Sequence, residues 1–353
     1  MDLLFDFDKP AMGNDLIGRT EEINSLIDSV VDKKKGVVIY DAPKSGKNTV
    51  VRNALEKLKA RRFDFALCEI DLYNVRSYTE FLACFKEAVT KCFNEVNRNS
   101  LLPFSIDFRN LPEEKILEVP QLVAEESGRK LVIYIKEFQN LLAAEDNGFS
   151  IDNLDKLWSK QTDVRYIITG SFVNMMKTIF EDRKVFYYML NPITLKPLPK
   201  KETVDYIVST CLNVGRVINQ DVADEIWRIS GGSLWYVKQL CSYCYAFPAG
   251  YITDQVVEQA EAALINNNRP RFMQIMLDLT PNQINFLKAV LDGVQRFSSQ
   301  EVLDTYHLNS SANVFRLKDA MKKKEIVSFD KDDCARILDP LFEYWLRNFY
   351  FKR

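Results

Sequence analysis

Short runs of apolar residues alternate with longer stretches of helical periodicity over the first two hundred residues of the chain. The runs are rich in β-branched side chains, as expected for strands that are buried on both faces of a sheet. Four runs are clear and a fifth is weaker: Val37–Tyr40, Phe65–Leu72, Leu131–Ile135, Tyr166–Thr169 and, as the weaker one, Ile193–Leu195. This alternation predicts an α/β unit in which helices cover both faces of a parallel sheet.

The pattern changes near Lys200, and from there to Asn266 only helical periodicity is found. The polar segment Asn266–Pro270 then predicts a linker, because it places asparagines and a proline between two helical patterns. We therefore expect three domains, with the sheet in residues 1–198, an all-helical unit in 199–270 and a last domain in 271–353.

The last domain reads as three helices followed by a hairpin. Thr280-Pro281 can open the first helix, Ser298–Glu301 predicts a capped second helix, and Ser310-Ser311 precedes a third. Two short apolar runs, Ile326–Phe329 and Arg336–Leu338, are separated by turn-forming residues and predict the hairpin. This order of elements predicts a winged helix-turn-helix domain.

The third of these helices is basic, with Arg316, Lys318 and Lys322–Lys324 along it. Such a helix is compatible with DNA contact by a recognition helix. The alternative is a solvated helix end, where lysines interact favourably with the helix C-terminus. We favour this alternative, because 47 basic and 49 acidic residues leave the whole chain near neutral.

The charge balance also implies no general attraction to an anionic membrane. No apolar run approaches the roughly 18 residues that a membrane-spanning helix needs. We therefore expect a cytoplasmic protein without a membrane partner.

Seven scattered cysteines and one histidine, His307, offer little metal or nucleophile chemistry. Cys241 and Cys244 form a C-x-x-C pair within a helical pattern, but no second Cys or His pair lies nearby in the sequence. A packed-core role is the favoured interpretation, and we expect no metal site.

The segment Asp41–Asn48, directly after the first apolar run, has the layout of a phosphate-binding loop. Such a loop reads G-x-x-x-x-G-K-[ST]: backbone N–H groups surround the phosphates, the lysine reaches the β and γ phosphates, and the hydroxyl holds Mg²⁺. Gly46 and Lys47 match this pattern, and a helical pattern begins at Thr49. Strand, loop and helix therefore follow in the order that nucleotide binding requires.

Two positions of the loop depart from the pattern. Asp41 replaces the first glycine, and a carboxylate about 4 Å from a phosphate would cost about 1–4 kcal/mol, depending on the effective dielectric. Asn48 replaces the metal-binding hydroxyl, and Thr49 is no substitute because one step along a helix turns the side chain by roughly 100°. The alternative is an ordinary strand-turn-helix with a lysine at its surface.

These features together resemble the prokaryotic STAND-type, AAA+-related P-loop ATPases, which carry a P-loop NTPase core, a helical lid and a C-terminal winged helix. The resemblance covers nearly the whole chain. It is carried by Ile17–Glu22, similar to the family's G-R-x-x-E box beside the adenine; by Ile168–Ser171, similar to its sensor strand; by Ile193–Leu198, similar to the strand that ends its core; and by Asp339–Leu346, similar to its closing winged-helix signature.

The catalytic positions of that family are altered here. Its metal-holding strand ends in Asp-Glu, whereas this one ends in Lys136-Glu137. Its Tyr-Gly-Arg aligns with Phe186–Tyr188, and its Gly-Gly-x-Pro turn with Gly231–Leu234. The resemblance implies Glu137 as a candidate catalytic base, but a base without a metal-held triphosphate has little to act on. We therefore expect little or no hydrolysis.

Nucleotide binding is a separate expectation, since Lys47, the loop amides and the helix N-terminus can still attract phosphate. We expect ATP or ADP as ligand, with Mg²⁺ not tightly held. The expected binding residues are Ile17, Gly18, Arg19, Lys44, Ser45, Gly46, Lys47, Asn48, Thr49 and Lys136. One hypothesis is that the Lys136 ammonium partly replaces the metal's charge and neutralises Asp41. The alternative is that Lys136 and Asp41 simply pair in an empty site.

Three functions stay open on this basis. The favoured one is a nucleotide-binding or vestigial switch or scaffold whose winged helix or lid meets another protein. The second is a slow but active ATPase that uses Lys47 and Glu137. The third is a DNA-binding regulator.

Overall fold

The computed structural model describes residues 5, 7–32, 35–98, 112, 115–145, 148–248 and 250–351. The chain divides into two compact units. One comprises Arg19–Leu195, and the other comprises Met1–Gly18 together with Lys196–Arg353. The first eighteen residues thus group with the C-terminal part of the chain.

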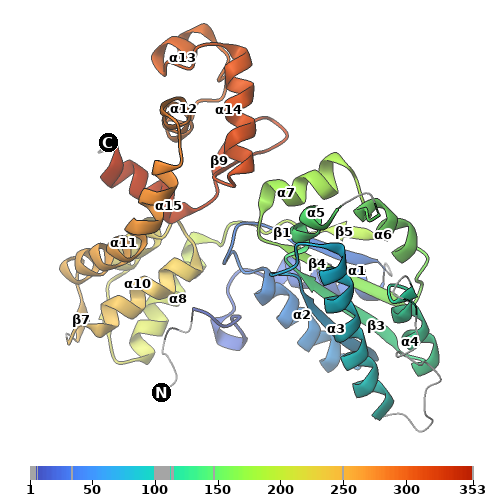
Figure 1. Cartoon of the computed structure of the whole chain (residues 1–353). Coiled ribbons are helices and arrows are strands. Elements are labelled where there is room, and N and C mark those ends of the chain that lie inside the picture. Colours follow the sequence, from blue (N-terminus) through green and yellow to red (C-terminus); the bar gives the residue numbers. More distant parts are fainter. Residues whose placement is uncertain are drawn as a thin grey trace. The chain divides into compact units, whose positions relative to one another are not determined.

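In the unit Arg19–Leu195, the described residues form a five-stranded parallel sheet (Figure 1). Its strands are β1 Gly36–Tyr40, β2 Phe65–Asp71, β3 Lys130–Lys136, β4 Val164–Gly170 and β5 Leu190–Pro192. Their order is β2-β3-β4-β1-β5, and every pairing is parallel. The parallel sheet that the apolar runs predict is confirmed.

Helices cover both faces of this sheet. Successive side chains of one strand point to opposite faces, so neighbouring residues pack against different helices. On β3, Ile133 and Ile135 pack into the core that contains Phe81 of α3, whereas Tyr134 lies between them in sequence and reaches Asn48 of α2. The helical elements of this unit are α1 Thr20–Val31, α2 Lys47–Ala60, α3 Tyr78–Arg98, α4 Val119–Ser127, η3 Phe138–Asn140, α5 Leu141–Ala144, α6 Ile151–Trp158, α7 Val173–Lys177 and η4 Thr178–Asp182.

The fifth strand lies earlier than the sequence predicts. β5 covers Leu190–Pro192, and the predicted run Ile193–Leu195 follows it, with the Ile193 N–H still donating to the Val38 carbonyl at 2.9 Å. Asn191 and Pro192 are poor strand formers, so the pattern points past them. They are tolerated because β5 is an edge strand, where a proline removes no ladder bond on the open side.

The helical lid begins after Pro199. It contains α8 Lys200–Asn213, α9 Gln220–Ile229, α10 Leu234–Ala246 and α11 Asp254–Leu277. The sequence pattern predicts helices only, but two short strands, β6 Val217–Ile218 and β7 Tyr251–Ile252, pair in parallel between them. Two-residue strands are too short to show a period of two.

Helix α11 runs without a break through the segment that the sequence predicts to be a linker. Asn266–Pro270 is therefore helical, and the linker prediction is wrong. A proline inside a helix costs about 3 kcal/mol, because it removes a backbone hydrogen bond and crowds the carbonyl four residues earlier. Burial of Leu264 and Phe272 on either side of Pro270 offsets this cost, since a fully buried apolar side chain contributes about 1.5–3 kcal/mol.

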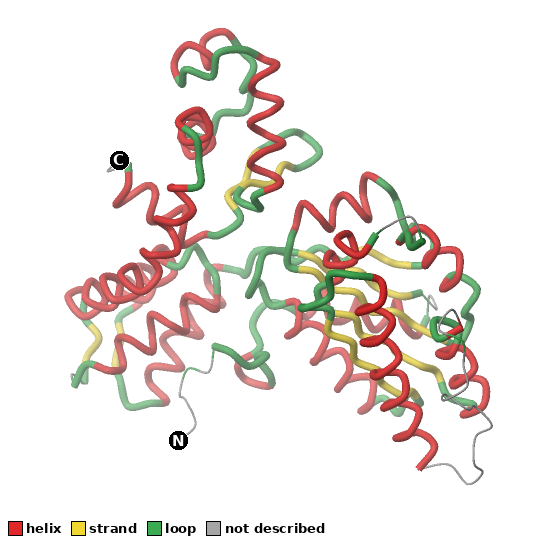
Figure 2. Tube along the Cα trace, viewed as in Figure 1, coloured by secondary structure: helices red, strands yellow, loops and turns green. Residues whose placement is uncertain are grey.

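The C-terminal part has the elements of a winged helix. They are α12 Pro281–Leu291, α13 Gln300–Thr305, α14 Ser311–Lys323, the antiparallel pair β8 Val327–Phe329 and β9 Ala335–Ile337, then α15 Pro340–Trp345 and η5 Leu346–Tyr350 (Figure 2). Thr280 forms a capping box with Gln283, and Ser310 caps α14, as the sequence predicts. Ser299 stands at the N-cap of α13 without a side-chain cap bond.

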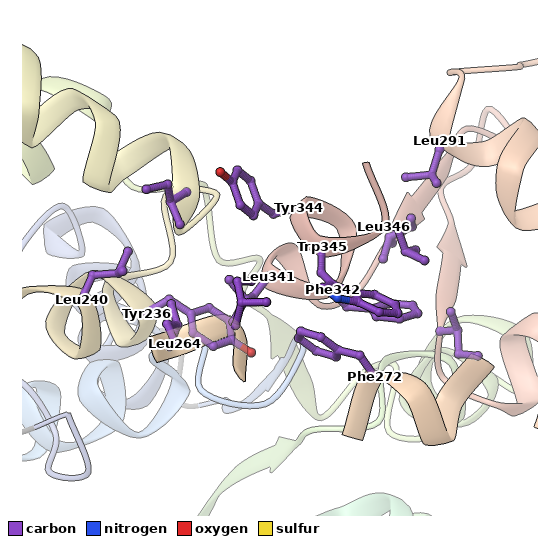
Figure 3. Packing of buried hydrophobic residues seen from close by; sticks show 14 of the residues in the cluster. Tyr236, Leu240, Leu264, Phe272, Leu291, Leu341, Phe342, Tyr344, Trp345 and Leu346 are labelled. Atoms are coloured by element: carbon purple, nitrogen blue, oxygen red, sulfur yellow. The ribbon is translucent and has the colours of Figure 1, made fainter. Parts of the chain in front are cut away.

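Lid and winged helix share one hydrophobic core. Figure 3 shows Phe272 of α11 beside Phe342 and Trp345 of α15, and both ring-centroid distances are 5.4 Å. Tyr236 and Leu240 of α10 belong to the same cluster. The two parts are therefore packed together rather than joined by a flexible connection.

Asp339 adds polar contacts to this core. Its carboxylate accepts hydrogen bonds from the Tyr236 hydroxyl at 3.1 and 3.2 Å and from Arg271 Nη2 at 2.6 Å. It also caps α15 by accepting from the Leu341 and Phe342 N–H groups at 3.0 and 3.2 Å. One side chain thus joins two lid helices to the start of α15.

Replacing Asp339 with alanine is expected to destabilise this unit by about 1–3 kcal/mol. The change removes an N-cap and leaves the buried Tyr236 hydroxyl without that acceptor. The measurement is a urea melt against wild type. Glu343→Gln is the matched control, because Glu343 pairs with Arg347 on the surface and should shift the melt by less than about 0.5 kcal/mol. Equal shifts for the two variants would contradict this role of Asp339.

Candidate functional site

The predicted phosphate loop connects β1 to α2 and ends in a left-handed turn. Gly46 has φ 99° and is the N-cap residue of α2, where no side chain caps the helix. Lys44 is exposed and also has positive φ, 64°. The first N–H groups of this 14-residue helix carry partial positive charge and favour an anion.

Lys47 is buried at this helix start. Its ammonium donates to the carbonyl oxygens of Asp41 and Ala42, both at 2.8 Å, and to Ser45 Oγ at 3.4 Å. Burial lowers the pKa of Lys47 to about 8, although the nearby charges of Asp41 and Glu137 oppose the shift. The lysine is therefore inside the loop rather than a surface residue after a turn.

The Asp41 carboxylate takes part in the loop's own turn, since its Oδ1 accepts from the Ala42 N–H at 2.8 Å. This local bond is one that an aspartate can make and a glycine cannot. The carboxylate also favours the charged form of Lys47. Asp41 therefore partly balances the lysine's charge within the loop.

Arg19 reaches the phosphate loop directly. Its buried guanidinium donates to the Ser45 carbonyl and to Glu22 Oε1, both at 3.1 Å. Ile17 and Gly18 belong to the other compact unit, where Ile17 is buried and a Cβ on Gly18 would come within 2.7 Å of Pro199 Cδ. Their contact with a nucleotide base stays a prediction.

Asn48, at the position where a metal-binding hydroxyl is predicted, contacts a tyrosine. Asn48 Oδ1 accepts from the Tyr134 hydroxyl at 3.4 Å. Burial raises the pKa of this tyrosine to about 12, so it stays a neutral donor at physiological pH. Thr49 is half-buried, and its backbone carbonyl accepts from Asn53.

At the end of β3, Lys136 pairs with Glu69 rather than with Asp41. The Lys136 ammonium lies 3.6 Å from Glu69 Oε2 and 5.4 Å from the centre of the Tyr134 ring. Arg52 of α2 binds both oxygens of Glu69 at 2.6 Å. Burial alone would raise the pKa of Glu69, but the bonds to Arg52 and the charge of Lys136 hold it below its usual range.

This cluster carries two cations and one carboxylate, so it keeps a net positive charge beside Tyr134. Among the described residues, no group of three or more His, Cys, Asp or Glu side chains is arranged to hold a metal ion. Sequence reasoning singled out Lys136 but missed Arg52, Glu69 and Tyr134. The signal was present, because Glu69 is an acidic residue between the apolar Cys68 and Ile70 of a strand.

Glu137 is held by two neighbours. Its Oε1 accepts from Ser171 Oγ at 2.8 Å, and its Oε2 accepts from Gln139 Nε2 at 2.8 Å. Its backbone is left-handed, with φ 54°, which is uncommon for a residue other than glycine. The candidate base is thus near Lys47 but is held by Ser171, directly after β4, and by Gln139 of η3, and Gln139 was another residue that sequence reasoning missed.

Phe186–Tyr188, which the sequence predicts to align with a Tyr-Gly-Arg motif, carries aromatic side chains. Phe186 is fully buried, whereas Tyr187 and Tyr188 are 65% and 86% exposed. Lys184 and Phe186 both have positive φ, 54° and 59°. No guanidinium stands at these three positions.

Several solved structures share this fold. The Walker-type ATPase of Pyrococcus abyssi has a TM-score of 0.73 and 16% identity, covering 98% of this chain and 99% of its own. The ORC2 protein of Aeropyrum pernix, in ADPNP–ADP complexes, has a TM-score of 0.63 and 12% identity, covering 97% and 96%. The ORC1 protein of Aeropyrum pernix, in complex with DNA, has a TM-score of 0.55 and 14% identity, covering 99% and 97%.

A family described as "Probable winged helix domain" matches residues 270–348. No curated protein sequence matches the chain. Within the described part of the chain, none of the helices has the length and apolar character needed to cross a membrane. At these identities the likeness is one of fold: a parallel sheet covered by helices, followed by a helical lid and a C-terminal winged helix, as in the Walker-type ATPase of Pyrococcus abyssi.

Proposed function

We propose that this protein binds ATP or ADP in its phosphate loop without a tightly held Mg²⁺ and hydrolyses it little or not at all. The nucleotide would serve a switch or a scaffold that presents the lid and winged helix to another protein. The observation that carries this proposal is the contrast between Lys47, which is buried inside the loop, and the two predicted metal positions, Asn48 and Lys136, which contact Tyr134 and Glu69.

The phosphate side of the site fits a nucleotide. Lys47 would hold the phosphates together with the N–H groups at the start of α2, where no side chain competes as a cap. Lys44 and Ser45 line the same loop. The solved ORC2 protein of similar fold contains ADPNP and ADP, which supports the same ligand class here.

The metal side fits Mg²⁺ poorly. Mg²⁺ requires oxygen ligands in near-octahedral geometry, and it is held in P-loop proteins by a hydroxyl and an acidic residue. Asn48 offers one amide oxygen that already accepts a hydrogen bond, and Lys136 offers an ammonium. The cluster of Lys136, Arg52 and Glu69 adds fixed positive charge on this side, which can partly replace that of a divalent ion.

An assay of phosphate release from ATP tests whether the protein lacks hydrolysis. With saturating ATP and Mg²⁺, the expected rate is no higher than that of Lys47→Ala. The competing function is a slow ATPase, and Glu137 is the observation that favours it, because it lies close enough to Lys47 to affect its pKa. Release that clearly exceeds the Lys47→Ala background would favour this second function.

The affinity for ADP is expected to fall as the pH rises through about 8. The pKa of Lys47 is lowered to about 8 by burial, so the free protein loses this positive charge above that pH. Nucleotide binding must then recover a proton, which reduces affinity by up to about tenfold per pH unit. The terminal phosphate does not change charge in this range, because its second pKa is about 6.

Calorimetric titrations of ADP from pH 7 to 10 measure this effect. Lys47→Arg is the control, because an arginine stays charged over the whole range and should give a nearly flat profile. Parallel profiles for the two proteins would contradict the assignment of the pH dependence to Lys47.

A protein partner is favoured over DNA by the charges around α14. Lys318 is paired with Asp333 of the wing, and Lys323 with Asp319 at 2.9 Å. Phe315 on the same helix is 75% exposed, and aromatic side chains are enriched at protein interfaces.

Fluorescence anisotropy with duplex DNA tests the choice between a protein partner and DNA. Binding that weakens steeply with salt and is lost when Lys322, Lys323 and Lys324 become alanine would favour DNA.

A further inference from the structure

Arg19 contacts the backbone of the phosphate loop, at the last residue before the glycine turn. Its Nη2 donates to the Ser45 carbonyl at 3.1 Å, and its Nη1 donates to Glu22 Oε1 at 3.1 Å. Arg19 and Glu22 are 7% and 5% exposed. The guanidinium is therefore fixed on one side by α1 and reaches the loop with the other.

The Ser45–Gly46 peptide determines where an important donor points. In a trans peptide the carbonyl and the next N–H point in opposite directions. With the Ser45 carbonyl held by Arg19, the Gly46 N–H is turned away from Arg19. In a P-loop the N–H groups around this glycine are the ones that surround the phosphates.

The loop turn needs such a support. Lys44 and Gly46, on either side of Ser45, both have positive φ, 64° and 99°. A Cβ on Gly46 would stand 3.8 Å from Arg19 Nε, so the arginine lies along the turn itself. Glycine at this position also leaves the chain with maximal conformational freedom before binding.

The other half of the loop has the opposite polarity. The Asp41 and Ala42 carbonyls accept from the Lys47 ammonium, so they point to the lysine. The first half of the loop thus binds the lysine through its carbonyl oxygens, whereas the second half can donate its N–H groups to a ligand. In this second half, the Ser45 carbonyl accepts a hydrogen bond from the buried Arg19 guanidinium.

We infer that Arg19 is a positioning residue, which holds the Ser45–Gly46 peptide so that the loop amides are preorganised for the phosphates of a nucleotide. This inference rests on the proposed nucleotide site and gives Arg19 a role in phosphate binding through the loop. Its two bonds require a planar, forked donor, which lysine lacks.

The first test compares ligands and variants by calorimetry in EDTA. Arg19→Lys and Arg19→Ala are both expected to weaken ADP binding by about tenfold or more, while binding of adenosine changes little, because only phosphates meet the loop amides. Arg61→Ala, at the far exposed end of α2, is the matched control and should leave both ligands unaffected. If Arg19→Lys bound ADP as tightly as wild type does, the positioning role of Arg19 would be overturned. It would also be overturned if adenosine binding weakened as much as ADP binding.

The second test needs no nucleotide. Hydrogen exchange of the peptide covering residues 41–50 is expected to accelerate severalfold in Arg19→Lys relative to wild type, because the loop loses one of its fixed carbonyls. Peptides from α14 should exchange as in wild type. Unchanged exchange over 41–50 would overturn the inference, whereas failure of wild type to bind ADP would overturn only the proposed function.

Discussion

Lys47→Ala is expected to reduce the affinity for ADP and ATP by at least about thirtyfold. The ammonium is buried inside the loop, where it already binds two carbonyl oxygens and lies at the start of α2. Truncating one partner of a buried, hydrogen-bonded charge contact costs about 2–5 kcal/mol, and each 1.4 kcal/mol is a factor of ten. Calorimetric titration of both nucleotides measures the loss.

Lys57→Ala is the matched control for this prediction. Lys57 lies on the same helix but is exposed near its other end, so its removal should leave affinity within about twofold. Circular dichroism checks that both variants keep their helices. Full nucleotide affinity in a folded Lys47→Ala variant would show that nucleotide does not bind in this loop.

Phe342→Ala is expected to have the largest effect on stability, a loss of about 3–5 kcal/mol. Phe342 is 2% exposed, and its ring lies 5.4 Å from that of Phe272 and 6.0 Å from that of Trp345. The cavity would open at the point where α11 of the lid meets α15. Urea melts followed by circular dichroism measure the change.

Phe315→Ala is the control, since it removes the same side chain from an exposed position of α14. Its expected effect is within about 0.5 kcal/mol, as for most surface substitutions. A Phe342→Ala variant that unfolds at the wild-type urea concentration would contradict the shared core of lid and winged helix.

Much of the fold could be predicted because its signals are local. Four strands occur at the predicted apolar runs, since a strand buried on both faces needs apolar residues throughout. Thr280 and Ser310 predicted two helix starts, because a side-chain oxygen bonds to the backbone N–H three residues later. The hairpin of the wing also had a local signal, because the turn-forming residues Asp330–Cys334 separate its two strands.

The failures arise where tertiary contacts override local preference. Pro270 suggested a chain break, but apolar burial along α11 keeps the helix continuous. Asn191 and Pro192 masked a strand that only an edge position permits. Neither environment can be read from the residues alone.

At the candidate site, the sequence identified Lys47, Lys136 and Glu137 but not their partners. Arg52 and Glu69 lie far apart in the chain, and only the sheet order brings α2, β2 and β3 together around Tyr134. The pairing of Lys136 with Glu69 replaces the alternative of a Lys136–Asp41 pair. Asp41 contacts its own loop instead, and its carbonyl binds Lys47.

In the proposed function, the nucleotide is held by the loop and its lysine without help from a metal ion. The most direct measurement is the affinity for ATP in excess Mg²⁺ compared with that in EDTA. The expected affinities agree within about threefold, and the double variant Asn48→Thr with Lys136→Asp should regain a preference for Mg²⁺. Wild-type binding that occurs only with Mg²⁺, together with brisk turnover, would contradict metal-independent nucleotide binding.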